Sequence, residues 1–274
     1  MTEAVPPAAH ARAILAAHGS ARQIAPLSGW DPSLDLPASY RVSAEVRRLR
    51  EARGERPVGR KIGFTNTRMW EEYGVRAPIW SHIYDTTLRE APALDGPLPL
   101  GAFVEPRIEP EVVFGLRAAP EPGMDARALI ACVDWAAPGF EIVQSLFPGW
   151  RFTAADTVAA FGLHGTLVLG ERVRIATGEA AGWLAALAGF ETVLTCDGAE
   201  ADRGIAGNVL GRGPLAALAH LVAVLVDDPG GPPLAAGEVV STGTLTRALP
   251  VAGGEVWRMR IDGAALPDLT LALG

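Results

Sequence analysis

The chain has 274 residues, of which 49 % are hydrophobic and 20 % are charged, and its formal net charge is -7. This composition predicts an ordinary folded protein with a large core, and no block of Lys or Arg indicates binding to nucleic acid or to an anionic membrane. Apolar stretches such as 215–226 are too short to span a bilayer, and the first residues lack the pattern of a secretion signal. We therefore expect a cytoplasmic protein with a small-molecule partner.

Helical spacing or a high Ala and Leu content predicts helices at 10–18, 42–54, 124–137, 178–190 and 213–228. From GRKIGF (59–64) onward, short β-rich runs separated by Gly, Pro and Asp predict strands at 110–116, 140–147, 165–170, 190–198, 237–246 and 255–263. Helices and strands do not alternate regularly. The expected fold class is therefore α+β, with a mixed or antiparallel sheet.

Two glutamates stand one residue apart in the apolar, β-branched run 106–115, PRIEPEVVFG. On a strand, Glu109 and Glu111 point to the same face, and Pro110 between them suggests an edge or a bulge. One interpretation is a solvated edge strand that displays two acids. The other is a site for a divalent cation, and a third carboxylate, Glu141 between Phe140 and Ile142, favours it. Oxygen ligands alone indicate Mg²⁺ or Mn²⁺.

Lys61, between Gly59 and Gly63 in an apolar setting, adds a cation to these carboxylates. Near a metal site, such a lysine is expected either to bind a substrate carboxylate or to polarise an oxygen. The common alternative is a lysine at a strand end whose ammonium reaches solvent.

Several motifs in this order resemble one family: GRKIGFTN, IYDTT, VEPRIEPEVVFGL, FEIVQSLFPGWRFTAADTVAAFGLHG and AGEVVSTGTLT. The resemblance is to the 2-keto-4-pentenoate hydratase and 2-oxo-acid decarboxylase branch of the fumarylacetoacetate hydrolase superfamily. It implies a helical N-terminal region at 1–57, a mixed β-roll catalytic domain of the superfamily's C-terminal type at 58–274, and a homo-oligomer. It also implies Mg²⁺ or Mn²⁺ held by Glu109, Glu111 and Glu141.

The resemblance further implies roles for single residues. Lys61 matches the family's active-site lysine, and Asp85 in IYDTT matches an acid that assists proton transfer. The substrate pocket is expected to be lined by the segment that contains Ser241, Thr242, Gly243 and Thr244.

The implied chemistry agrees with the carboxylate pattern. A 2-oxo acid or 2-hydroxy-dienoate offers a carboxylate oxygen and a C2 oxygen that chelate one metal ion, which stabilises the enolate. The leading function is a metal-dependent lyase that hydrates a 2-hydroxy-2,4-dienoate to a 4-hydroxy-2-oxo acid in aromatic-compound degradation. The alternatives are a 2-oxo-acid decarboxylase, a hydrolase that cleaves a C–C bond of a diketo acid, and a non-catalytic partner subunit.

Some residues depart from the hydratase pattern or have more than one interpretation. Leu163 and His164 stand where typical hydratases have small polar residues, so His164 is either an additional acid/base or specificity residue, or a loop histidine satisfied by backbone groups. Asp156 is a helix cap, a partner of a site residue or a structural acid. Three bulky residues near Asp85 either shape the pocket or simply pack, namely Trp70, Trp80 and His82.

Overall fold

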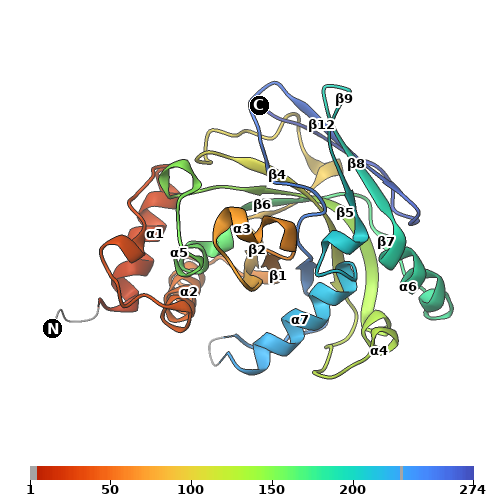
Figure 1. Ribbon diagram of the computed structural model, residues 1–274, viewed down its shortest axis with the longest axis horizontal. Helices are drawn as coiled ribbons and strands as arrows, with labels where there is room; N and C mark the ends of the chain where they lie inside the picture. Colours follow the sequence, from red (N-terminus) through yellow and green to blue (C-terminus); the bar gives the residue numbers. More distant parts are fainter. Residues whose placement is uncertain (1–4, 229–230) are drawn as a thin grey trace.

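The computed structural model describes residues 5–228 and 231–274, and it has the α+β composition that the sequence predicts. Its helices are α1 (Pro7–Gly19), α2 (Leu36–Glu51), α3 (Trp70–Tyr73), α4 (Ala126–Ala131), α5 (Ala154–Ala159), α6 (Ala180–Gly189) and α7 (Pro214–Val226). In Figure 1, α1 and α2 lie at one end of the molecule, α6 lies at the other, and α7 runs along the lower side.

Most of the chain after α2 forms two sheets. Their strands are β1 (Pro57–Gly63), β2 (Ile79–Tyr84), β3 (Leu88–Glu90), β4 (Arg107–Leu116), β5 (Val133–Val143), β6 (His164–Leu169), β7 (Val173–Arg174), β8 (Glu191–Cys196), β9 (Ala199–Ile205), β10 (Val239–Ser241), β11 (Leu249–Pro250), β12 (Val256–Asp262) and β13 (Leu269–Ala272).

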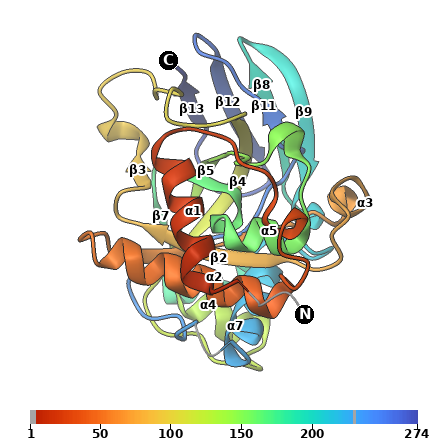
Figure 2. The ribbon, with the colours of Figure 1, turned by 90° about the vertical axis from the view of Figure 1, so that its left-hand side faces the viewer.

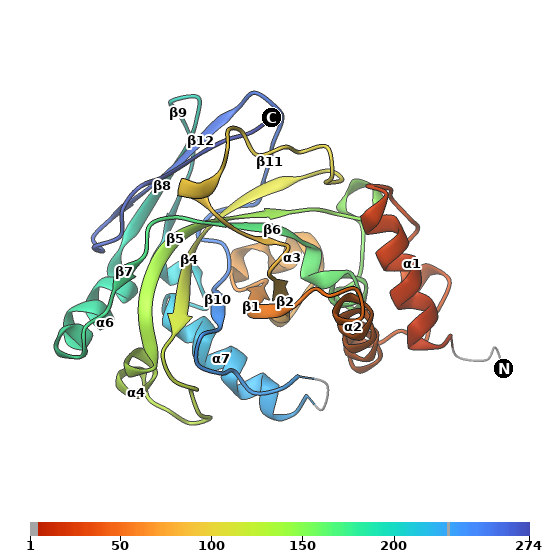
Figure 3. The ribbon, with the colours of Figure 1, turned by 180° about the vertical axis from the view of Figure 1, so that it is seen from behind.

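The larger sheet is mixed and has the order β2-β1-β10-β4-β5-β6-β3, with β11 on β4 and β7 on β5. The pairs β1 with β10 and β3 with β6 are parallel, and the other pairs along this path are antiparallel. Figure 3 shows the long strands β4 and β5 bending strongly along their length. The smaller antiparallel sheet, β13-β12-β8-β9, lies outside this bend and shares one core cluster with β4 and β5.

The N-terminal helices pack on the segment that follows β5. Asp35 caps α2 by accepting a hydrogen bond from the Ala38 N–H, and Ile14 of α1 and Val42 of α2 share a buried cluster with Phe161. Figure 2 shows α1 and α2 in front of the sheet on this side. The division into a helical N-terminal region at 1–57 and a β-roll catalytic domain at 58–274 stays a prediction.

The prediction of a helix at 124–137 is wrong for its second half. Only Ala126–Ala131 is helical, and from Val133 onward the chain belongs to β5, where Ala136 lies opposite Phe114 of β4. Pairing with a long neighbouring strand satisfies the backbone of this segment and overrides its local helical preference. The predicted strand at 237–246 is also shortened to β10, because the residues after Ser241 leave the sheet.

Candidate active site

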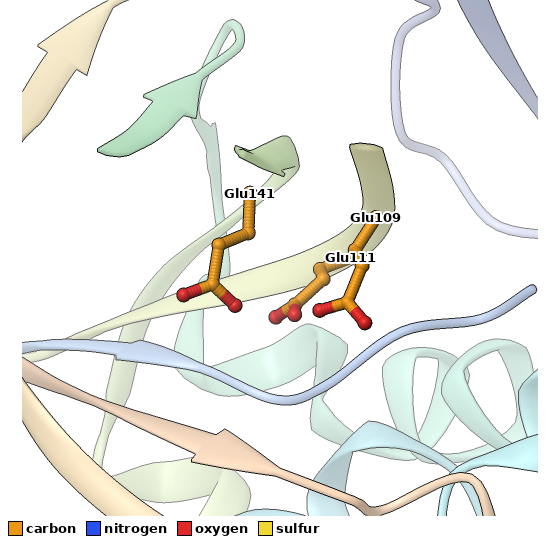
Figure 4. A group of neighbouring side chains, drawn as sticks. All are labelled: Glu109, Glu111 and Glu141. Atoms are coloured by element: carbon orange, nitrogen blue, oxygen red, sulfur yellow. The ribbon is translucent and has the colours of Figure 1, made fainter. Parts of the chain in front are cut away.

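Three carboxylates converge on one face of the larger sheet. Glu109 lies directly opposite Glu141 in the antiparallel register of β4 and β5, and Glu111 follows two residues along β4 on the same face. Each residue offers an oxygen within 4.8 Å of the others. Figure 4 shows the three side chains leaving two neighbouring strands and pointing the same way. Glu111 and Glu141 are buried, whereas Glu109 keeps partial exposure.

Five strands that are neighbours in the sheet supply the polar groups of this site. Lys61 comes from β1, Ser241 from β10, Glu111 from β4, Glu141 from β5 and His164 from β6. Residues separated by as much as 180 positions in the sequence therefore meet on one face of the sheet. The order of strands, and not the order of the chain, builds the site.

Glu111 is held by hydrogen bonds from the segment after β10. The Ser241 hydroxyl and the Gly243 N–H both donate to Glu111 Oε2, the second over 2.8 Å. Gly243 has φ 93°, and a Cβ at this position would lie 1.8 Å from Thr65 Oγ1, so only glycine fits here. Glu111 Oε1, in contrast, is buried and accepts no hydrogen bond from the residues that the structure describes.

Lys61 joins the cluster through Glu141. Its Nζ lies 2.9 Å from Glu141 Oε2 and donates a hydrogen bond of 3.0 Å to the Gly162 carbonyl. Burial alone would lower the pKa of Lys61, but the charges of Glu141, Glu109 and Glu111 raise it. The ammonium is therefore charged at neutral pH.

His164 lies behind Glu141, away from the open part of the site. Its Nδ1 is 2.6 Å from Glu141 Oε1, and its Nε2 is 2.9 Å from Thr87 Oγ1. Burial lowers the pKa of His164 although Glu141 opposes this effect. An ionised carboxylate only accepts, so Nδ1 carries the proton and the neutral ring accepts from the Thr87 hydroxyl at Nε2. His164 therefore fixes the orientation of Glu141.

The charges of the cluster are not balanced by protein groups. Burial raises the pKa of Glu109 to about 7 despite the opposing charge of Lys61, and burial together with Glu141 raises the pKa of Glu111 well above its usual value. Burial also opposes ionisation of Glu141, but Lys61 and His164 lower its pKa to about 2. Three carboxylates thus face one ammonium, and Glu111 Oε1 has no donor. This arrangement fits a divalent cation with oxygen ligands.

A narrow cavity of about 30 Å³ opens beside the cluster. Lys61, Glu109 and Thr244 line its polar part, and Leu163 and Tyr73 belong to the apolar remainder. A larger cavity of about 630 Å³ lies elsewhere, between α2, β2 and the end of α7. Among the described residues, no member of the carboxylate cluster lines this larger cavity, so we assign the chemistry to the narrow one.

Asp85 lies outside the site, contrary to the expectation from IYDTT. Its carboxylate accepts hydrogen bonds from the backbone N–H and the Nε of Arg56, both over 3.0 Å. Lys61 pairs with Ser81 on β2, and Asp85 is four residues further on, on the order of 13 Å away along an extended strand. The motif contributes Thr87 instead, through the hydrogen bond with His164.

The segment expected to line the pocket does so in part. Thr244 lines the narrow cavity, and the Gly243 N–H holds Glu111. Thr242 turns the other way, because its hydroxyl donates to the Val112 carbonyl over 2.7 Å. Of these three residues, Thr242 therefore supports the backbone and does not face the cavity.

The remaining candidate residues are Asp156 and the three bulky residues near Asp85, and their contacts are structural. Asp156 completes a capping box with Thr153 at the start of α5 and accepts hydrogen bonds from the Ser28 N–H and hydroxyl. Trp80 lines the larger cavity, and neither Trp70 nor His82 lines the narrow one. The interpretation that these bulky residues shape the pocket is not supported by their positions.

Sequence reasoning singled out Leu163 but missed the other residues around the apolar part of the cavity and the turn that precedes Leu163. Phe161, Gly162 and Leu163 have φ values of 59°, 61° and 64°, a left-handed turn that directs the Gly162 carbonyl to Lys61. The glycines on either side of Leu163 and His164 in FGLHG were the available signal. Backbone angles of this kind do not follow from residue type when two of the three residues are not glycine.

Comparisons with known proteins identify the family of the chain. The chain is 34 % identical over 245 residues to a 2-hydroxyhexa-2,4-dienoate hydratase of Comamonas testosteroni, with 89 % of each chain covered. It is 31 % identical over 249 residues to a 2-keto-4-pentenoate hydratase of Burkholderia vietnamiensis, with 90 % of each covered. No protein-family model matches the chain. Within the described residues, the structure contains no helix long and apolar enough to cross a membrane.

Among solved structures, the chain resembles a 4-oxalocrotonate decarboxylase of Pseudomonas putida G7, complexed with magnesium and adipate. The TM-score is 0.87 at 25 % identity, and the alignment covers 99 % of this chain and 100 % of the other. The predicted fold type is confirmed. The chain belongs to the 2-keto-4-pentenoate hydratase and 2-oxo-acid decarboxylase branch of the fumarylacetoacetate hydrolase superfamily.

Proposed function

We propose that this protein is a metal-dependent hydro-lyase that adds water to a 2-hydroxy-2,4-dienoate and yields a 4-hydroxy-2-oxo acid. The observation that carries the proposal is the unbalanced, buried group of Glu109, Glu111 and Glu141 beside a charged Lys61. A merely structural role has no need for such a cluster, which costs free energy without a cation. The similarity to two proteins named as hydratases of this substrate class supports the proposal.

Glu109, Glu111 and Glu141 would hold Mg²⁺ or Mn²⁺, and the choice between the two ions is part of the proposal. When bound, the cation supplies Lewis acidity that stabilises negative charge on substrate oxygens. A structural neighbour that is complexed with magnesium supports a divalent ion as the cofactor.

The residues of the chain position the substrate and the ligands. Lys61 presents a buried ammonium beside the carboxylate cluster, so it is placed to bind the substrate carboxylate or a developing oxyanion. Ser241 and Gly243 fix one oxygen of Glu111, and His164 fixes one oxygen of Glu141. The Gly162 carbonyl holds the ammonium of Lys61 at the edge of the cavity.

Decarboxylation of a 2-oxo acid is the second candidate function. The observation that favours it is the structural similarity to a 4-oxalocrotonate decarboxylase over 99 % of the chain, at a TM-score of 0.87. Loss of CO₂ and addition of water both develop negative charge on a C2 oxygen, so the same residues serve either outcome.

The test is the ultraviolet absorbance of freshly generated 2-hydroxypenta-2,4-dienoate with Mg²⁺, with Mn²⁺ and with a chelator, followed by mass analysis of the product. Metal-dependent loss of absorbance with the mass of one added water supports the hydratase. Release of CO₂ from a 2-oxo acid without added water moves the assignment to the decarboxylase. Failure to bind either metal contradicts both functions.

We also propose a cytoplasmic homo-oligomer that acts in aromatic-compound degradation. The cysteines Cys132 and Cys196 are unpaired, which fits a reducing compartment. Leu36 and Val226 are exposed near the apolar larger cavity, a surface that association would cover. Light scattering during size-exclusion chromatography tests the assembly, since a monomer at micromolar concentration would contradict it, and cell fractionation tests the location.

A further inference from the structure

The narrow cavity has a charged end and an apolar end. Lys61 and Glu109 mark the charged end, next to the carboxylate cluster. The apolar part of the lining, which we name the tail wall, consists of Phe64, Met69, Tyr73, Val143, Trp150 and Leu163. All six of these side chains belong to one hydrophobic cluster, separate from the main core of the protein.

The two ends orient a substrate. A 2-hydroxy-dienoate carries its carboxylate and its C2 oxygen at one end, and these oxygens match the charged end of the cavity. The rest of the molecule, its tail, must then lie against the tail wall.

Leu163 occupies its place on the tail wall through an unfavourable backbone conformation. Phe161, Gly162 and Leu163 form the left-handed turn, in which a leucine is disfavoured and a glycine or an asparagine is tolerated. The turn nevertheless places a buried leucine beside the cavity, one residue from the carbonyl that holds Lys61. Strain of this kind persists where the surrounding structure requires a particular side chain in a particular place.

Arg107 is a second cation near the cavity, but it does not line it. Arg107 lies on the same face of β4 as Glu109, but its Nη1 donates to the Tyr73 hydroxyl over 2.8 Å, and its guanidinium lies 4.1 Å from the centre of the Trp150 ring. Among the described residues that line the cavity, Lys61 is the only Lys or Arg. A second carboxylate on the tail would therefore be desolvated against apolar and aromatic groups without a partner charge.

We propose that the tail wall, with Leu163 as its determinant, selects a dienoate with a short, uncharged tail and rejects one that ends in a second carboxylate. This inference rests on the proposed function and names its substrate class. Leu163 is a specificity-determining residue in this assignment, since it contacts the tail and not the reacting atoms.

The experiment compares kcat/KM with Mg²⁺ for 2-hydroxypenta-2,4-dienoate, 2-hydroxyhexa-2,4-dienoate and 2-hydroxyhexa-2,4-dienedioate. We expect the two uncharged substrates to exceed the dienedioate by about a hundredfold or more. Leu163→Asn keeps a residue that tolerates the left-handed turn but makes the wall polar. It should lower kcat/KM for the hexadienoate by about tenfold, mainly through KM, and more than for the pentadienoate.

Two further variants control for indirect effects. Leu163→Met keeps the wall apolar and should retain the wild-type order of the three substrates. Arg107→Met removes the nearby cation and should also retain this order. Thermal unfolding with and without Mg²⁺ confirms that each variant folds and binds the metal.

Binding without turnover gives an independent readout. Calorimetry of the Mg²⁺-loaded protein with 2-oxohexanoate and 2-oxoadipate should show tighter binding of the first by about a hundredfold. If no dienoate is hydrated but 2-oxohexanoate still binds more tightly, the hydratase proposal fails and the inference on the tail stands. Turnover of the dienedioate within tenfold of the uncharged substrates, by hydration or by decarboxylation, overturns the inference. Loss of that turnover in Arg107→Met would assign the second carboxylate to Arg107 instead.

Discussion

Two neighbouring residues of β1, Arg60 and Lys61, are equally buried, at 2 % exposure each, but they face opposite sides of the sheet. Arg60 lies 2.5 Å from Glu238 Oε2, a single carboxylate that balances its charge. Lys61 faces the three carboxylates of the site. A balanced buried ion pair is complete within the protein, whereas an unbalanced one requires a further cation. The difference distinguishes a structural charge from a functional one.

Removing a carboxylate should have opposite effects on the two faces. In Glu111→Gln, the amide oxygen can still accept from Ser241 and Gly243, but one negative charge of the cluster is lost. We expect metal-dependent turnover to fall by at least about a thousandfold. The free energy of unfolding of the metal-free protein should rise by about 1 kcal/mol, because the wild type holds a third buried carboxylate close to the other two and the variant does not. Calorimetric metal titration and urea unfolding measure both effects, and wild-type turnover in this variant would remove the site from the proposal.

Replacing Lys61, the cation on the face of the sheet that carries the three carboxylates, should affect turnover but not metal binding. Lys61→Met keeps the three carboxylates and much of the volume of the side chain, so Mg²⁺ should still bind. The bound Mg²⁺ should restore the stability that the metal-free variant loses with the ammonium. Turnover should fall by about a hundredfold or more, because the ammonium no longer holds substrate oxygens. If metal binding is lost together with turnover, Lys61 has a structural role only.

The matched change on the other face is Glu238→Gln. The amide keeps the hydrogen bond that Glu238 Oε1 accepts from the Ala235 N–H, but buried Arg60 loses its counter-charge. The expected cost is about 3 kcal/mol of unfolding free energy, at the low end for buried pairs because Glu238 is partly exposed. Metal affinity should stay at the wild-type value. A change in metal affinity as large as that in Glu111→Gln would break the distinction between the two faces.

Acid should destabilise the protein through the face of the larger sheet that carries Arg60. His82 lies opposite Arg60 on β2, and burial, followed by the charge of Arg60, lowers its pKa from 6.5 to about 2. The unfolded chain therefore binds the proton first, and the folded protein loses about 1.4 kcal/mol for each pH unit below 6.5 through this group. His82→Phe keeps an aromatic ring beside Trp80 and should show a shallower loss of unfolding free energy between pH 6.5 and 5. His18, whose pKa burial lowers to about 4, still contributes in the variant, and equal slopes would contradict the role of His82.

The carboxylates were predictable because their signal is local. Glu109 and Glu111 share a face by strand alternation, and Glu141 is conspicuous in an apolar run. The assignment of Asp85 depended on a matching motif, whereas His164 was singled out because it departs from the family pattern, and the structure gives both residues other partners than those considered from the sequence. Asp85 binds Arg56, and His164 is bonded at both nitrogens. A motif fixes which segment approaches the site, but the turn after β2 decides that Thr87, and not Asp85, points inward.

The sequence by itself determined the α+β class, the strand that carries two glutamates and the cluster of charges in apolar surroundings. These features depend on residue type and on spacing of a few positions, which chain periodicity controls. Only the tertiary structure decided that β1, β10, β4, β5 and β6 are neighbours and that Lys61 meets Glu141. It alone decided the left-handed turn that puts Leu163 beside the cavity. Long-range strand order and backbone strain result from packing the whole chain, and no short window of sequence contains them.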